Sequence, residues 1–219
     1  MLGHKRGIYF GSIRNVVAVM ACLLLASCGR IGGAASGSGS SHADSTSATT
    51  ATVSKSDTSG SNSGVLIAES APGVTINISS AVRTSDVRNY KGGGQTIRYD
   101  LDDDAAPYTV MVDNYHLSDK SASALVGEEQ EAFKQGGAVV ESKDVSVSGG
   151  SNAHRLDWTQ QAQSPWQLDD KAPSISIACT AVIFEGPQNY TYGVYVMADA
   201  SKPESLKSVQ KIIDSITVN

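Results

Sequence analysis

The chain has 219 residues, with 17 basic and 22 acidic side chains and a formal net charge of −5. This length allows one domain of ordinary size with appended segments. Three of the basic residues precede Cys28 and all 22 acidic residues follow it, so the chain from Cys28 onward carries 14 basic residues and a formal net charge of −8. That charge argues against nucleic acid and against anionic lipid headgroups as partners.

The N-terminal segment begins with basic residues and continues with an apolar run over residues 16–26. A run of about ten apolar residues is typical of a signal-peptide core, whereas a spanning helix needs about 20. Leu25 and Ala26 precede Ser27 and Cys28 in a pattern that resembles the bacterial lipobox. The alternatives are an ordinary signal peptide and an uncleaved anchor, but Gly29 and its neighbour interrupt the apolar run too early for an anchor.

The lipobox resemblance implies cleavage between Ser27 and Cys28 and attachment of a lipid, with acyl chains such as palmitate, to the Cys28 thiol. Residues 1–27 would then be a lipoprotein signal peptide. The protein would be lipid-anchored on the extracytoplasmic face of a bacterial cell membrane.

Residues 28–64 are rich in Gly, Ser, Ala and Thr and poor in large apolar side chains. Such a segment cannot bury enough surface to offset its ordering entropy, so we expect a lipidated, disordered tether, with O-glycosylation as an alternative role for its hydroxyl groups. Residues 65–219 are then the folded domain, which is long enough to bury a core without disulfides.

Alternating apolar residues predict three strands before the first helix, at 74–78, 96–101 and 108–115. A helix is predicted from Ser121 to Gln135, ended by Gly136 and its neighbouring glycine. Its expected apolar stripe includes Leu125 and Phe133, and Glu129 is assigned to the solvated side together with the other acidic residues of the segment.

Four further strands are predicted at 139–147, 153–160, 174–184 and 190–198, with a tight turn at 149–152 and a longer connection at 161–173. Ser201 and Glu204 have the spacing of a capping box that opens a final helix. Its expected apolar stripe comprises Leu206, Val209, Ile213 and Ile216.

This order predicts an α+β fold, with a mostly antiparallel sheet of about six to seven strands and two helices that cover one face of it. The polar tether, the order of the elements and the closing segment 212–216 resemble the PsbP-like fold family, which includes small actinobacterial lipoproteins of the LpqN type. The resemblance implies a non-enzymatic binding or assembly module.

Candidate catalytic and metal-binding residues do not form a complete set. Asp100, Asp102 and Asp104 have the spacing that opens a calcium loop, but the glycine and the glutamate of such a loop are missing. His154 and Asp157 are three apart on a predicted strand and should therefore lie on opposite faces. Cys179 lies on the apolar face of a strand and is expected to be a buried thiol. We expect no catalytic residue, cofactor or metal.

Trp166 lies in the predicted 161–173 connection, where an aromatic side chain can contact a partner or else cover the edge of the sheet. We therefore expect a non-enzymatic module that binds an envelope protein or a glycolipid. The alternatives are an envelope hydrolase without a recognisable motif and a carrier of a lipid or another small apolar ligand.

Overall fold

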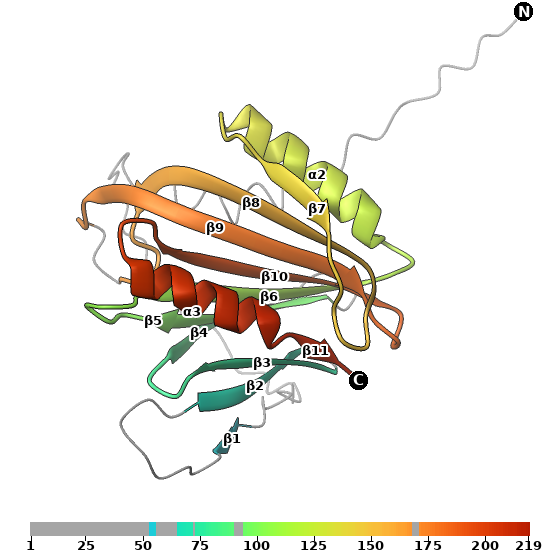
Figure 1. Ribbon diagram of the computed structural model, residues 1–219. Helices are drawn as coiled ribbons and strands as arrows, with labels where there is room; N and C mark the ends of the chain where they lie inside the picture. Colours follow the sequence, from blue (N-terminus) through green and yellow to red (C-terminus); the bar gives the residue numbers. More distant parts are fainter. Residues whose placement is uncertain (1–52, 56–64, 72, 90–93, 168–170) are drawn as a thin grey trace, which may run out of the picture. The chain divides into compact units, whose positions relative to one another are not determined.

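Two antiparallel sheets and two helices form the fold seen in the computed structural model (Figure 1). The structure describes residues 53–55, 65–71, 73–89, 94–167 and 171–219, all of which belong to the unit Ser40–Asn219. The elements are β1 (Val53–Lys55), β2 (Val65–Ala71), β3 (Val74–Ser79), β4 (Arg83–Asn89), β5 (Gln95–Leu101), β6 (Tyr108–His116), α2 (Ala122–Gln135), β7 (Glu141–Asp144), β8 (Ser151–Gln163), β9 (Ser174–Glu185), β10 (Tyr190–Asp199), α3 (Pro203–Asp214) and β11 (Thr217–Val218).

The small sheet has the order β1-β2-β3-β11 and the large sheet the order β4-β5-β6-β10-β9-β8-β7. The pairings between these strands are antiparallel, and β7 to β10 form a meander of sequential neighbours. The predicted α+β fold, with a mostly antiparallel sheet of six to seven strands and two helices, is thereby confirmed.

The two helices cover opposite faces of the large sheet, so the expectation that both cover one face is wrong. Tyr195 of β10 donates a hydrogen bond to Glu129 of α2, whereas its neighbour Val194 packs in one cluster with Val209 of α3. Because successive side chains of a strand point to opposite faces, the helices lie on the two sides. Residues of both parities are buried in β9 and β10, as expected for strands covered on both faces.

Several strands differ from the prediction. β1 lies inside the segment expected to be a disordered tether, and β2, β4 and β11 were not predicted. β1 and β11 are too short for an alternation to show, and β4 has the polar sequence RTSDVRN. These segments are strands because they pair with neighbouring strands, and their own sequence pattern does not predict them.

Helix α2 begins and ends where predicted. Ser121 accepts a hydrogen bond from the Ala124 amide, and Gly137 has a φ of +82°, the left-handed conformation that commonly ends helices. Glu129, expected on the solvated side, is instead buried. It lies four residues after Leu125 and four before Phe133, which places all three on one helical face.

Helix α3 begins at Pro203, so the predicted capping box is wrong. Ser201 donates its amide and hydroxyl hydrogens to Asp199 and makes no cap. Proline is well suited to this first position because the first amides of a helix have no partner within it. Leu206, predicted to be part of the core stripe, is 41% exposed.

The strands around the 149–152 turn also differ from the prediction. β7 covers only four residues of the predicted 139–147 strand, and each of them is exposed. β8 begins at Ser151 and ends at Gln163, so it is longer than predicted at both ends. Gly149 has a φ of +78° and lies against the Val218 carbonyl, so this turn depends on glycine.

Candidate functional site

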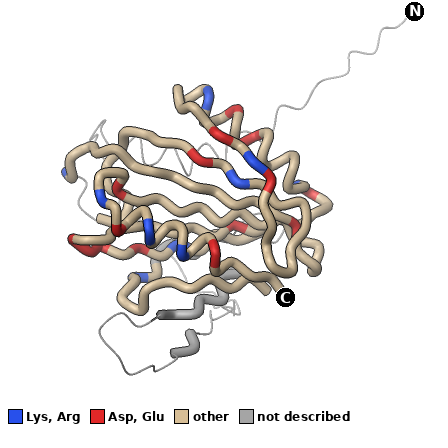
Figure 2. The backbone as a smooth tube through the Cα atoms, in the orientation of Figure 1, with Lys and Arg blue, Asp and Glu red and all other residues tan. Residues whose placement is uncertain are grey.

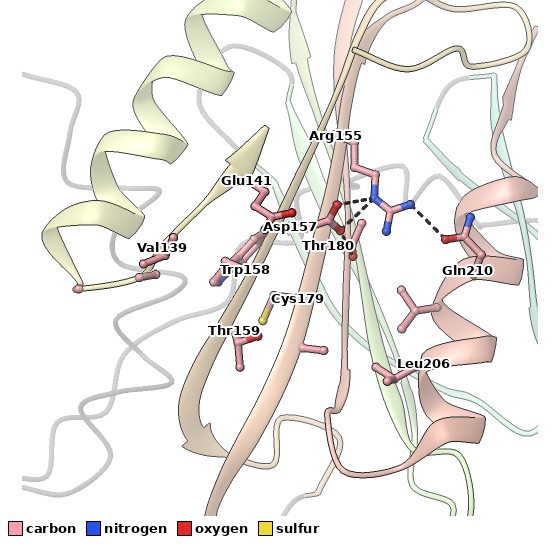
Figure 3. Close-up of a pocket in the computed structure, with 14 residues that line it drawn as sticks. Val139, Glu141, Arg155, Asp157, Trp158, Thr159, Cys179, Thr180, Leu206 and Gln210 are labelled. Carbon is pink, nitrogen blue, oxygen red and sulfur yellow. Dashed lines mark hydrogen bonds and ion pairs between the residues drawn. The ribbon is translucent and has the colours of Figure 1, made fainter. Parts of the chain in front are cut away.

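An open pocket of about 670 Å³ lies between α3 and the edge of the large sheet (Figure 3). Side chains of β8 and β9 form its floor on the α3 side of the sheet, including those of Thr159, Ala178 and Thr180. Leu206, Val209 and Gln210 of α3 form one wall, and the segment from Gly137 to Glu141 forms the opposite rim. The pocket is therefore bordered on one side by the α2–β7 connection and on the other by α3.

A charged network lies on the pocket floor. The Nε atom of Arg155 donates to both carboxylate oxygens of Asp157, at 2.9 and 2.8 Å, and Thr180 donates its hydroxyl to Asp157 at 2.7 Å. Arg155 also donates to the Gln210 amide oxygen at 3.1 Å, which joins β8 to α3. Lys143 lies 3.6 Å from the same carboxylate.

This network keeps Asp157 ionised. Partial burial raises the pKa of Asp157, but the hydrogen bonds from Arg155 and Thr180 and the positive charges of Arg155 and Lys143 together hold that pKa below its ordinary value. A carboxylate in this state is a poor general base near neutral pH. Its structural effect is to fix the orientation of Arg155.

The rims of the pocket carry apolar side chains that face solvent. In the described part of the chain, the large apolar side chains that stand exposed are Val139, at 85%, and Leu206, at 41%. Both line this pocket. Exposed apolar side chains on either side of one concave surface are typical of a binding site.

Charged residues of both signs follow β7 and β8 (Figure 2). Residues of both strands line the pocket. His154 pairs with Asp144 at 2.8 Å, while Lys143 and Arg155 pair with Asp157. The exposed Glu141 carboxylate has no ion-pair partner among the described residues.

His154 and Asp157 lie on opposite faces of β8, as predicted. Asp157 faces the pocket, while the partner of His154 in β9 is Ile183, which lies on the α2 side. The two side chains are therefore not brought together. Cys179 is buried on the α2 side, as predicted, and burial raises the pKa of its thiol far above the ordinary value.

Trp166 is 2% exposed, so the prediction that its side chain is free to contact a partner is wrong. Its carbonyl accepts from Arg83, and the adjacent Pro165 carbonyl accepts from Arg98. The Trp166 side chain is therefore buried in the fold and is not presented to a partner.

The three aspartates with calcium-loop spacing do not converge. The Asp100 side chain is 1% exposed and is bonded to Arg83, Arg98 and Thr109, whereas Asp102 and Asp104 are exposed. Across the described residues, no group of three or more His, Cys, Asp or Glu side chains is placed to hold a metal ion.

A second polar cluster lies beneath α2 and is buried. Tyr195 donates to Glu129 at 2.9 Å, and Tyr115 donates to Oδ2 of Asp113 at 3.3 Å. Burial raises the pKa of Glu129 to about 7, with the nearby charge of Asp113 adding to the effect and the Tyr195 hydrogen bond opposing it. Burial likewise raises the pKa of Asp113 to about 6, against hydrogen bonds from Thr96 and Tyr115.

Carboxyl groups with pKa values near neutrality often mark acid–base sites. Here, however, Glu129 is 2% exposed, Asp113 is 5% exposed, and neither lines the open pocket. Sequence reasoning missed this cluster, although the spacing of Glu129 from Leu125 and Phe133 was a usable signal. It also missed the pocket, because Leu206 was assigned to the core stripe of the final helix and residues 139–147 were assigned to one continuous strand.

Ser27 and Cys28 lie outside the described residues, as does the tether apart from residues 53–55. Within the part that the structure describes, neither helix is long and apolar enough to span a membrane. No protein-family model matches the chain, and no curated protein matches it either.

Proposed function

We propose that this protein is a lipid-anchored, extracytoplasmic module that binds an envelope protein or glycolipid through the pocket beside α3. The observation that carries the proposal is the open pocket of about 670 Å³ with Val139 and Leu206 exposed on its two rims. Burying such side chains against a partner is favourable by about 25 cal/mol for each Å² of apolar surface removed from water.

The anchor is supported by the sequence alone. Residues 16–26 are apolar, Leu25 to Ser27 precede Cys28 in lipobox order, and the acidic residues all follow Cys28. A PsbP-like relationship is supported by the order of strands, α2, the β7–β10 meander and α3.

Binding without covalent chemistry is supported by the state of the pocket's polar groups. Asp157 is held by Arg155 and Thr180, so none of these three side chains is poised as a nucleophile or a base. A hydrolase would need such a group within reach of substrate. A carrier of apolar ligands would need an enclosed cavity, whereas this pocket is open and has a charged floor.

The anchor is tested with Cys28→Ser. We expect the wild-type chain to incorporate a labelled fatty acid and to fractionate with membranes, and the variant to lose the label and leave the membrane fraction. A variant that stays in the membrane without the label would show that another segment holds the protein there.

The pocket is tested with a photo-crosslinking amino acid placed at Leu206 in the full chain in cells. We expect one dominant crosslinked partner, which is lost when Val139→Asp is introduced on the opposite rim. The same amino acid at Lys211, an exposed position of α3 that does not line the pocket, is the matched control. Equal products from both positions would contradict the proposal.

A further inference from the structure

The outer edge of β8 is only partly paired. β7 pairs with His154 to Asp157, while β8 continues to Gln163. Within the described ranges, no strand pairs with β8 on this side beyond Asp157. Figure 3 shows the segment that leads into β7 diverging from β8 beside Val139.

One hydrogen bond fixes which main-chain groups face this edge. The Val145 amide donates to the Ala153 carbonyl at 3.0 Å, so the Ala153 main chain faces the β7 side. In an antiparallel ladder the N–H and C=O of alternate residues point to the same neighbouring strand. Thr159 and Gln161 lie an even number of residues after Ala153, so their N–H and C=O groups point outward, where no described backbone group bonds them.

We propose that this edge of β8 binds an extended peptide segment of a partner protein as an added strand, with one peptide side chain in the pocket beside α3. The inference rests on the proposed function because both use the same pocket. A row of outward N–H and C=O groups is matched by an extended main chain, which is how strand addition gives affinity.

The pocket determines the chemistry of the peptide. A residue paired with Thr159 points its side chain to the same face as Thr159, toward Ala178 and Leu206. That side chain should therefore be apolar. The end of the added strand lies near Glu141, whose exposed carboxylate has no described ion-pair partner, so a Lys or Arg is expected there.

A partner peptide fits this edge better than a second copy of the chain. Residues 158–163 carry none of the charges with which natural edge strands often prevent self-pairing, so the choice between a peptide and a second copy rests on the net charge of the chain. The acidic excess of the chain would instead oppose close approach of two copies and favour a peptide with basic residues.

The test uses a displayed library of random 12-residue peptides, selected against the full chain, and a synthetic copy of the strongest binder. Its affinity is measured by fluorescence anisotropy for wild type, Gln161→Pro, Gln161→Ala and Leu206→Asp. Proline removes the outward N–H of residue 161 and is tolerated on edge strands, whereas alanine keeps that N–H. Thermal unfolding checks that each variant is folded.

We expect selected peptides with an apolar residue near a Lys or Arg, binding at least 10-fold weaker to Gln161→Pro and within about 2-fold of wild type to Gln161→Ala. Equal losses for the proline and alanine variants would show side-chain recognition and overturn strand addition. If only Leu206→Asp weakens binding, the proposed pocket stands and the added strand fails. If no peptide is selected, or if Gln161→Pro instead abolishes a dimer of the chain, the peptide proposal is wrong. The proposed function is tested separately by the crosslink from position 206, which should be lost when Val139→Asp is introduced.

Discussion

The centre of the α3 side of the large sheet is filled by apolar side chains, with the charged pocket at its edge, whereas the α2 side encloses carboxyl groups. On the α3 side, Phe184, Tyr192 and Val194 pack with the small sheet and α3 in one cluster. On the α2 side, Glu129 and Asp113 lie among buried apolar residues. We therefore expect the apolar centre of the α3 side to respond to lost packing volume, and the buried carboxyl groups of the α2 side to respond to a rise in pH.

The largest effect is expected from a cavity on the α3 side. Phe184 is fully buried, and its ring lies 5.4 Å from that of Tyr192. Phe184→Ala should lower the free energy of unfolding by about 3–5 kcal/mol, since truncation loses both transfer energy and packing. Urea denaturation measures the change. Val139→Ala, at an exposed rim position, should change it by less than about 0.5 kcal/mol; similar effects for both would refute the assigned core.

A smaller, pH-dependent effect is expected on the α2 side. The pKa of Glu129 is about 7 in the fold, above its ordinary 4.5, so between these values the folded state binds more protons than the unfolded state. The free energy of unfolding should therefore fall as pH rises from about 4.5 to 7, by up to about 3 kcal/mol at 1.4 kcal/mol per pKa unit. Glu129→Gln should remove most of this fall. The smaller pH dependence that remains would come from Asp113, whose pKa is also raised.

Denaturation at pH 5 and pH 8 measures that difference. Glu131→Gln, on the exposed side of the same helix, is the control and should keep the wild-type pH dependence. If Glu129→Gln unfolds with the same pH dependence as wild type, the Glu129 carboxyl is not held in its protonated form by the α2 face.

The sequence pattern was sufficient to locate the elements whose apolar residues recur with the period of a helix or a strand. Alternation and capping located α2, β6, β9 and β10, and alternation alone separated His154 from Asp157. It was insufficient where pairing creates the element, as in β1 and β11, which are too short to carry a period. It also misplaced Leu206 and Glu129, because an apolar stripe identifies residues that can be buried, while the neighbouring elements decide which of them are.

The smallest effect is expected at Asp157, and its sign is opposite to that of Glu129. Hydrogen bonds and positive charge hold the pKa of Asp157 below its ordinary 3.8, so its ionised form stabilises the fold above about pH 4, and this contribution is lost as pH falls through the folded-state pKa. Asp157→Asn should cost less than about 1 kcal/mol at pH 7, because the ion pair is partly solvated, and nothing near pH 2. Denaturation at both pH values, with the exposed Asp102→Asn as control, measures it. Since Arg155 would lose its fixed orientation next to Gln210, peptide affinity should fall together with stability at pH 7. Equal destabilisation at both pH values would instead assign Asp157 a packing role and would show that its ionised form does not stabilise the α3 side.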